Sequence, residues 1–441
     1  PQKTDQRADI LKNAKLYKYR LRFSSDQVLG GITNNLLLTR YQPFAGGSGP
    51  IYMNNGNNLS WAFMATISDV LEDYRISGGF KPGINFSDNE YFVDFQNYRK
   101  RIDWGLNFYH AANSNLQFYT ETPDAYFSTK VLTNRYQVNV SYPFDRVRSV
   151  RLITSFRNDR VVMRPSQFST GSGIPNPYGL QRPDTNLRFV NFHFEYVHDN
   201  SLNKTQNIWH GVRWKVYMEN IMQLNKSQIV AGKEAQRQFT FNFGADFRHY
   251  LPIYRNFIWA VRGATDVSWG NQKLIYYLGG VDNWLSPKFN AENRPDPTQK
   301  YVYQSLALQM RGYRQNLANG NNNMVFNSEL RLPLFATFLN KPINNAFIRN
   351  FQLVQFIDLG TAWVGTFSGI ARPGVRYASP DPNNPVVVNV KAGGVGPFAG
   401  GYGFGARSTL LGYFIKVDAG WPMNGFFNNK PQWYFALGFD F

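Results

Sequence analysis

Apolar and polar side chains alternate at a period of two along most of this chain. In residues 239–248 the odd positions are apolar, four of them Phe, and the even positions are polar or small. Successive side chains of a β-strand point to opposite faces, so this pattern predicts strands with one apolar and one polar face. Similar alternation appears in the ranges 17–23, 59–67, 91–98, 102–109, 136–142, 150–156, 190–196, 212–219 and 257–268.

The aromatic content decides between a soluble sandwich and a membrane barrel. Phe, Tyr and Trp make up 17% of the chain, whereas the mean hydropathy is only -0.41. No apolar run reaches the roughly eighteen residues that a membrane-spanning helix needs. The outer face of a sandwich is solvated and would rarely carry Phe and Trp so regularly. The pattern therefore favours a transmembrane β-barrel with aromatics facing lipid and polar residues facing a wet lumen.

The lengths of the links between strands alternate as well. Short links near 69–74, 99–101, 143–146, 250–255 and 410–412 interleave with long ones near 25–57, 111–129, 161–184, 271–322 and 365–399. Outer-membrane barrels combine short periplasmic turns with long external loops. The link 334–350 is an exception, since it is longer than a tight turn. We expect a polar lead-in or linker over 1–14, a barrel of about sixteen strands over 15–441, and both termini on the periplasmic side.

The two ends of the chain are expected to meet. The last predicted strand, from Trp433 to Phe441, ends on an aromatic residue. An open strand edge in lipid would leave backbone groups unpaired, so this strand should pair with the first one, near residues 17–23. The predicted seam comprises Tyr19, Leu21, Phe23, Phe435, Leu437, Phe439 and Phe441.

Charge and cysteine content narrow the partners and the chemistry. The formal net charge is +18, yet neither an aromatic RNA-binding signature nor a basic recognition helix accompanies it. We therefore expect anionic outer-membrane lipid and lipopolysaccharide as partners, and no nucleic acid. The chain has no cysteine, which excludes disulfides, thiol nucleophiles and thiolate metal sites.

The sequence gives little support for a catalytic motif. The five histidines are scattered and show no His-Glu-x-x-His spacing. Glycines 400–405 alternate with aromatic residues as in a curved strand, and no helix follows that could bind phosphate. Residues 170–173 lack the pattern of a nucleophile elbow. We predict no enzyme, no catalytic residue, no metal site and no cofactor.

Four motifs in the C-terminal third resemble a known family. They are Arg311-Gly312-Tyr313; residues 327–331 (NSELR) with Pro333; residues 356–360 (FIDLG); and residues 401–407 (GYGFGAR), followed by Leu411-Gly412 and Asp418. In this order they resemble the bacterial surface antigen (BamA-like) superfamily of outer-membrane insertases and transporters. The segments 68–73, 278–284, 311–316 and 410–414 are similar to barrels that often follow a TolB-like β-propeller in Bacteroidota.

The resemblance implies an internal latch. In the superfamily a loop-borne arginine folds into the lumen and bonds to acidic residues of the wall. The position that matches it is Arg311, and Glu329 and Asp358 lie on faces predicted to point inward. A guanidinium is a rigid fork that suits carboxylates. The predicted latch comprises Arg311, Gly312, Tyr313, Glu329, Asp358 and Arg407.

The sequence also suggests a role for glycines near this latch, and it leaves two alternatives to the latch open. Gly312 would let the loop turn tightly, and Gly403 and Gly405 would leave room beside it. A competing interpretation is that Glu329 and Asp358 only balance the charge of lumen arginines such as Arg331 and Arg407. A latch of this kind could also serve only to hold the shape of the barrel.

The fold class predicted is all-β, a transmembrane antiparallel barrel with the long loop 271–322 folded into the lumen. The resemblance implies a multi-pass outer-membrane barrel that acts in protein insertion or export through a lateral opening at the seam. The alternative is a barrel that anchors or gates a larger complex of envelope proteins without translocating anything itself. A passive porin is disfavoured, because the loop would obstruct flow.

Overall fold

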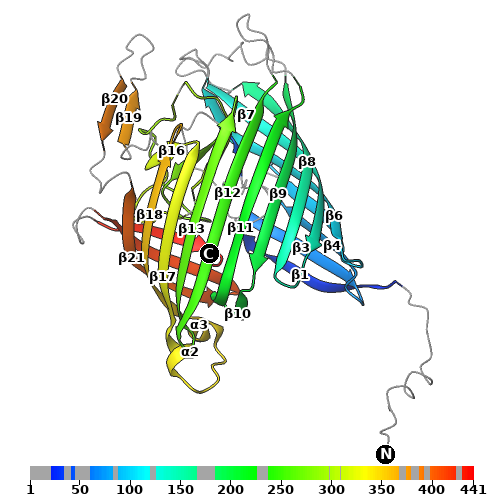
Figure 1. The fold of residues 1–441 in the computed structure, drawn as a ribbon, viewed down its shortest axis with the longest axis vertical. Coiled ribbons are helices and arrows are strands. Elements are labelled where there is room, and N and C mark those ends of the chain that lie inside the picture. The colour runs from blue at the N-terminus through cyan, green and yellow to red at the C-terminus, as the bar shows by residue number, and fades with distance from the viewer. Residues whose placement is uncertain are drawn as a thin grey trace, which may run out of the picture.

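The computed structural model describes residues 21–33, 41–44, 60–82, 88–119, 126–165, 184–225, 237–296, 298–307, 309–366, 374–378, 387–391, 398–423 and 430–441. The fold is an all-β antiparallel sheet curved into a barrel (Figure 1). Sixteen strands follow one another, each antiparallel to the next, as the sequence predicted.

These strands are β1 (Phe23–Thr33), β3 (Ser60–Asp69), β4 (Tyr74–Lys81), β5 (Glu90–Asn97), β6 (Asp103–Tyr119), β7 (Tyr126–Pro143), β8 (Arg148–Pro165), β9 (Thr185–Asp199), β11 (Ile208–Gln223), β12 (Phe239–Tyr254), β13 (Phe257–Gly270), β17 (Asn322–Pro333), β18 (Gln352–Trp363), β21 (Ala399–Leu410), β22 (Tyr413–Pro422) and β23 (Gln432–Leu437). The short β10 (Leu202–Thr205) pairs with the start of β11.

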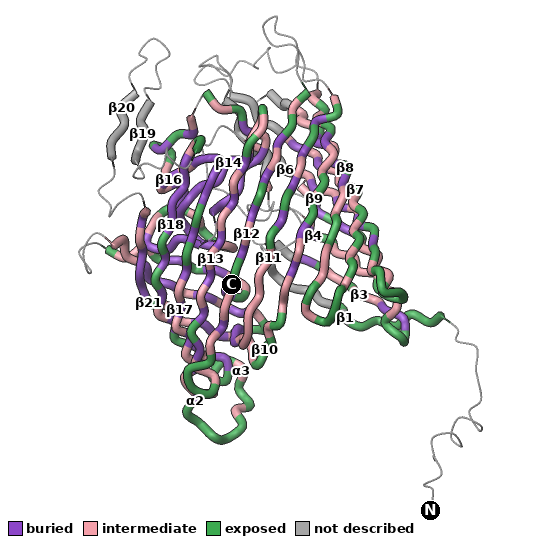
Figure 2. The backbone as a smooth tube through the Cα atoms, in the orientation of Figure 1, coloured by how far each residue is buried: buried purple, intermediate pink, exposed green. Residues whose placement is uncertain are grey.

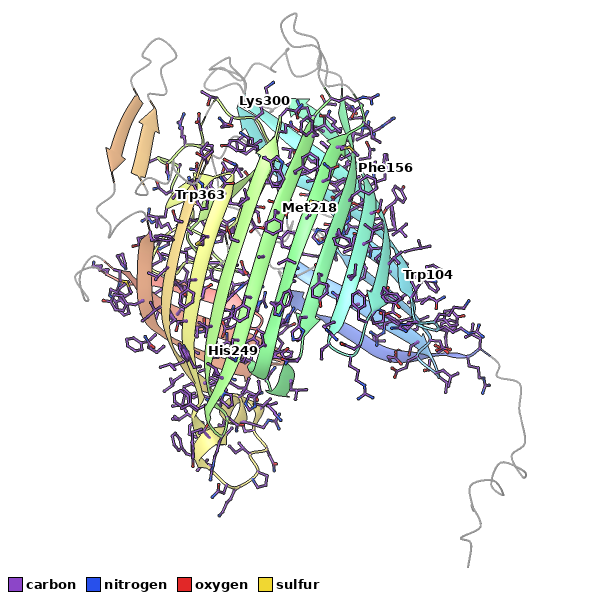
Figure 3. The ribbon with its side chains drawn as sticks, viewed as in Figure 1. Trp104, Phe156, Met218, His249, Lys300 and Trp363 are labelled. Atoms are coloured by element: carbon purple, nitrogen blue, oxygen red, sulfur yellow. The ribbon has the colours of Figure 1, made fainter. Side chains whose placement is uncertain are left out.

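Burial alternates along the strands (Figure 2). On β12, Asn242 is 0% exposed and its neighbour Phe243 is 44% exposed. Trp104, Phe156 and Met218, labelled in Figure 3, belong to the same exposed apolar outer face. On β12 the polar residues thus point inward and Phe243 points outward, as expected for a strand between a wet lumen and lipid. Some aromatic residues of other strands face inward, among them Phe189 and Phe356.

The two ends of the barrel differ. Short turns connect strands at the end that lies lowest in Figure 1, which we call the turn end. The link between β17 and β18 lies there and forms two short helices, α2 (Leu334–Phe338) and α3 (Ala346–Arg349). The Asn345 side chain caps α3 by accepting from the backbone N–H groups of Phe347 and Ile348. Among the described residues, no helix is long and apolar enough to cross a membrane.

The long link after β13 folds into a small sheet inside the barrel. Strands β14 (Lys273–Leu278), β15 (Tyr301–Leu306) and β16 (Ala318–Gly320) join β2 (Gln42–Pro43) of another loop in the order β16-β14-β15-β2. We call this unit the inner sheet. One apolar cluster packs it against inward residues of the wall; its members include Leu274, Tyr276, Leu278, Met310, Phe189, Ile221, Val325, Ala362 and Ala399.

The first strand lies later in the chain than predicted. It begins at Phe23, whereas alternation placed it near 17–23; residues 1–20, with Tyr19 and the lead-in 1–14, lie outside the described residues. Leu21 is exposed and precedes the strand. The segment 23–33 alternates poorly, but it pairs with β3 over its length, from Phe23 with Asp69 to Thr33 with Ser60. Backbone pairing, which does not depend on side-chain alternation, sets its position.

The last strand is shorter than predicted. It ends at Leu437, because Gly438 takes a left-handed conformation with φ of 100° that breaks the extended backbone. Phe439 is exposed, whereas Phe441 is only 5% exposed and packs inside the barrel against Ile258 and Ala260. The prediction that Phe439 and Phe441 continue the seam strand is therefore wrong.

The predicted external loops are partly strand as well. The link expected over 111–129 is shorter, because β6 continues to Tyr119 and β7 begins at Tyr126. Two further strands, β19 (Gly374–Ala378) and β20 (Val387–Lys391), form a hairpin within the link expected over 365–399. Beyond the bilayer both faces of a hairpin can be polar, so alternation no longer marks the strand.

Candidate functional site

The link between β13 and β17, which we call the inner loop, changes direction sharply at Arg311. Gly280 and Met310 exchange two backbone hydrogen bonds of 3.0 Å, which fix the chain just before Arg311. Gly312 follows with φ of 97°, a conformation that side chains rarely adopt. A Cβ atom there would also lie 2.7 Å from the carbonyl oxygen of Trp421. Glycine is therefore required where the loop turns against the wall.

Arg311 forms a fork on Asp358 of β18. Its Nε donates to Oδ2 at 2.7 Å and its Nη2 donates to Oδ1 at 2.9 Å. The backbone N–H of Arg311 also donates to Oδ2 at 3.0 Å. Asn327 of β17 donates to the same carboxylate at 2.8 Å and to the carbonyl oxygen of Gln309 at 2.7 Å. Asp358 thus holds both the side chain and the backbone of the loop.

The remaining nitrogen of the guanidinium reaches β17. Its Nη1 lies 2.7 Å from Oε1 of Glu329 and 3.9 Å from Oδ2 of Asp418. The Cζ atom lies 3.7 Å from the centre of the Phe356 ring, so the cation also stacks on an aromatic face. With only 1% of its surface exposed, Arg311 is compensated entirely by protein groups.

The contacts of Arg311 extend into a buried charge network. Arg331 Nε donates to Glu329 Oε2 at 2.8 Å. Arg407 donates to Asp418 from Nη1 at 2.7 Å and to Asp440 from Nε at 2.9 Å. Lys416 Nζ lies 3.4 Å from Asp440 Oδ1. We call this set the latch network; its four cations and four carboxylates are Arg311, Arg331, Arg407, Lys416, Glu329, Asp358, Asp418 and Asp440.

Different glycines from those predicted make room for the loop. A Cβ atom on Gly401 would lie 1.8 Å from the carbonyl oxygen of Arg311, and one on Gly420 would lie 2.6 Å from the Gly312 nitrogen. Gly403 faces Phe356 and Ala419 instead, and Gly405 faces Asp418. Sequence could not separate these positions, because glycine recurs on both faces of β21.

Tyr313 fastens the loop on the other side of the turn. Its hydroxyl donates to the carbonyl oxygen of Gly400 at 2.8 Å. Its own carbonyl oxygen accepts from the hydroxyl of Tyr434 at 2.7 Å. The structure thus brings the predicted latch residues Arg311, Gly312, Tyr313, Glu329 and Asp358 together, and Arg407 joins them through Asp418.

The edge of the last strand is occupied by the inner loop. Trp284 forms an isolated antiparallel bridge with Ala436, and the Leu285 N–H donates to the carbonyl oxygen of Phe435 at 2.9 Å. The Trp284 ring packs at a tilt of 56° against the ring of Tyr434, with a centroid distance of 4.7 Å. Among the described residues, no pairing register joins β23 to β1. The sequence marked residues 278–284 only through the family resemblance and gave no sign of this contact.

The end of the chain docks at the base of the lumen, which sequence reasoning missed. Arg331 Nη2 donates to the carbonyl oxygen of Phe441 at 3.1 Å, and its Cζ lies 4.8 Å from the centre of that ring. Asn207, in the turn between β10 and β11, donates to Asp440 at 2.9 Å and accepts from its N–H at 2.9 Å. These contacts join β11, β17 and the end of the chain.

The carboxylates of the latch network were compared with the requirements of a metal site. The part of the chain that the structure describes holds no group of three or more His, Cys, Asp or Glu side chains that could bind a metal ion. The acidic residues of the latch network are each engaged by arginine or lysine instead. The arrangement suits the fastening of a loop.

Comparison with known proteins places the fold. No family model matches the sequence, and no curated protein matches it. A similar solved structure is BamA from Haemophilus ducreyi lacking POTRA domains 1–3, at 14% identity and a TM-score of 0.50, over 95% of this chain and 70% of that one. Another is CdiB from Escherichia coli, at 11% identity and a TM-score of 0.47, over 96% of this chain and 63% of that one. This chain therefore shares the barrel fold of the BamA structure.

Proposed function

We propose that this chain is an outer-membrane barrel of the bacterial surface antigen type that acts in protein insertion or export. The observation that supports the proposal is the latch, in which Arg311 of the inner loop is buried on Glu329 and Asp358 of the wall. It occurs on a fold shared with BamA, at the positions where the family motifs fall. Placement in the outer membrane, with both termini in the periplasm, belongs to the same proposal.

The latch would set the resting state of the barrel. Withdrawal of the inner loop would leave Glu329 and Asp358 without Arg311, and breaking a buried ion pair typically costs about 3–5 kcal/mol. The loop therefore stays inside until another interaction replaces these contacts. A passive pore is a poor fit, because the inner sheet and its apolar cluster occupy lumen space that ions or solutes would need.

The seam between β1 and β23 would be the place that opens. Fifteen successive strand pairs have a hydrogen-bonded register, whereas none joins β1 to β23 among the described residues. The end of the chain turns into the lumen instead of extending the edge of β23. Opening here would break fewer backbone hydrogen bonds than opening between any other neighbours.

A cross-linking experiment tests whether the inner loop must leave the edge of β23 before the seam opens. Trp284 and Ala436 form an antiparallel bridge, so the next residues, Leu285 and Phe435, lie opposite each other. Both are exposed, and cysteines at these two positions therefore suit a disulfide. These 441 residues contain no cysteine that could interfere. We expect oxidation of the Leu285→Cys/Phe435→Cys variant to block insertion or export and reduction to restore it. The matched control is Phe243→Cys/Val267→Cys, which joins register partners of β12 and β13. Full activity of the oxidised Leu285/Phe435 variant would contradict the need for the inner loop to leave the edge of β23 before the seam opens.

The second candidate is a barrel that anchors or gates a larger envelope complex. The α2 and α3 helices favour it, because they present apolar side chains to solvent at the turn end: Phe338, Leu339, Phe347 and Ile348 are all exposed. Exposed apolar patches of this kind commonly mark contacts with protein or membrane.

Purification from native membranes separates the two candidates. Co-purification with other barrels or with insertion machinery, and loss of barrels from the membrane when the protein is depleted, would support insertion or export. A stable complex with other envelope proteins, with the membrane proteome unchanged on depletion, would support the anchoring role. Conductance across planar bilayers tests the remaining possibility, a passive pore, because a large steady current would identify an open pore.

A further inference from the structure

The outer face of the barrel carries an apolar groove of about 580 Å³ across β11, β12, β13 and β17. These strands lie side by side in the part of the wall that faces the viewer in Figure 1. Ala245, Gly263 and Thr265 form the floor of the groove, and the larger side chains of Phe247 and Phe326 stand on either side of it. The groove therefore opens toward the membrane and not toward the lumen.

Two tryptophans of β13 set the height of the groove in the membrane. Trp259 and Trp269 lie on the outer face, near the two ends of the strand, and are 41% and 45% exposed. A strand that rises about 3.4 Å per residue and tilts by about 35–45° covers roughly 25 Å of membrane thickness between these two positions. Outer-membrane barrels carry an apolar band of about this height between two aromatic girdles. Gly263 and Thr265 lie midway, so the groove is at the middle of the bilayer.

Gly263 leaves space that the fold does not require. β13 pairs with β12 and β17 through Gly263 without a register shift at that position, and its φ is not positive. A Cβ atom on Gly263 would meet no atom within 4 Å, whereas one on Gly244 would lie 2.1 Å from the Tyr217 ring. Glycine inside a strand weakens the strand and often marks a site where a ligand approaches closely. Since neither conformation nor packing calls for glycine here, the space suits a molecule from outside the chain.

The floor of the groove offers hydrocarbon contacts only. Thr265 is its one polar side chain, and the Thr265 hydroxyl donates to the carbonyl oxygen of Asn323 at 2.8 Å, within the wall. Met324, the register partner of Thr265 on β17, also lines the groove, and its flexible thioether adapts to irregular apolar shapes. An occupant therefore gains from apolar surface and finds no hydrogen-bond partner on the floor.

The width of the groove selects among apolar occupants. Phe247 and Phe326 are the register partners of Gly263 on the two neighbouring strands. Adjacent strands are about 4.8 Å apart, so the backbones that carry these rings are roughly 10 Å apart, and the rings narrow the space between them. A helix with its side chains is about 10–12 Å wide and does not fit. A single hydrocarbon chain does.

We propose that this groove binds the end of one acyl chain of a phospholipid, seated over Gly263 between Phe247 and Phe326. The chain would contact β12, β13 and β17 at once, and the headgroup would remain at the membrane surface beside one of the two tryptophans. Binding would occur whether the barrel inserts protein or anchors a complex, so its test is separate from that of the proposed function.

The test counts bound lipid by native mass spectrometry. The full chain is purified in detergent, exchanged until free lipid is removed, and titrated with dioleoyl phosphatidylethanolamine. We expect one tightly bound phospholipid per barrel. Gly263→Leu and Ala245→Leu each fill the floor and should each weaken the apparent affinity about tenfold or more, as displacement of two buried methylene groups implies. If one of these variants fails to fold, the other still decides.

The matched control is Val138→Phe. Val138 lies on the outer face of β7, is 47% exposed and does not line the groove. The change adds as many carbon atoms as Gly263→Leu does, and the variant should bind lipid like the unmodified chain. The absence of a tightly bound phospholipid, or equal affinity in all variants, would overturn the proposal.

Photolabelling locates the bound chain and identifies other occupants. A phospholipid with a diazirine at the end of its acyl chain should label β12, β13 or β17 in the unmodified chain and lose this labelling in Gly263→Leu. The same lipid with the diazirine next to the ester should not label the groove, and equal labelling by both probes would contradict the midplane position. A dimer that Gly263→Leu separates, with lipid binding unchanged, would assign the groove to contact between barrels and overturn the proposal.

Discussion

Two parts of the barrel wall contact the inner loop, and they hold it in different ways. On the wall from β17 to β23, eight charged groups form one buried network, and Arg311 alone contacts three carboxylates. On the wall from β7 to β11, ion pairs are local, a cavity remains, and Tyr303 is the described residue of the inner sheet that reaches Asp159. The part from β17 to β23 therefore fixes the loop through buried ion pairs, whereas the part from β7 to β11 contacts it loosely beside a cavity.

The comparison concerns how buried charge is compensated on each wall. A buried network with equal numbers of cations and carboxylates leaves little reason for an outside ion to enter.

The largest effect is expected from Arg311→Ala. The change takes the guanidinium away from Asp358 and leaves Glu329 with Arg331 only, so we expect a loss of stability of about 3–5 kcal/mol. Unfolding of the detergent-solubilised barrel, followed by heat-dependent gel mobility, measures it. Arg151→Ala on the opposite wall is the control and should cost about 1 kcal/mol or less, since its pair is partly solvated. Equal losses in the two variants would remove the distinction between the walls.

A smaller effect is expected from Gly401→Val. The Cβ atom would lie 1.8 Å from the Arg311 carbonyl oxygen, so the loop must move away from β21. Overpacking of this kind typically costs about 1–3 kcal/mol. We expect faster protease cleavage within 309–316 and a higher bilayer conductance.

The control for Gly401→Val is Gly263→Val, since a Cβ atom there meets no atom within 4 Å. The control variant should keep the cleavage rate and conductance of the natural chain. A Gly401→Val barrel with unchanged cleavage would show that the loop does not depend on close approach at this strand.

The smallest effect is expected from Tyr303→Phe, a change in the inner sheet where it faces the β7–β11 wall. The change removes one hydrogen bond of 3.4 Å to Asp159 and keeps the ring over Arg157. We expect a loss of about 0.5–1.5 kcal/mol in the same unfolding assay. A loss as large as that of Arg311→Ala would show that both walls hold the loop equally.

The sequence predicts the parts of this fold that depend on neighbouring residues. A period of two is visible within a single strand, so strand number and facing follow from segments such as 239–248. Arg311, Glu329 and Asp358 were identified because a family motif marks the first and strand alternation places the other two inward.

What sequence could not predict depends on distant partners. The inward turn after Leu437 requires Asp440 to meet Asn207, 233 positions away. The parallel pairing of β14 with β15 and the choice of Gly401 over Gly403 depend on how the loop lies against the wall. The position of β1 follows from β3, because side-chain alternation in 23–33 is weak.

The inner sheet also sets an order of assembly. Its strand β2 comes from residues 42–43, whereas its neighbour β15 comes from residues 301–306, and the latch network draws on β17, β18, β21 and β22. Contacts between such distant segments form late, since closing long loops costs entropy before any contact is gained. The inner sheet can therefore be fastened only after most of the wall exists, so a partly assembled barrel would keep an open lumen until its last strands arrive.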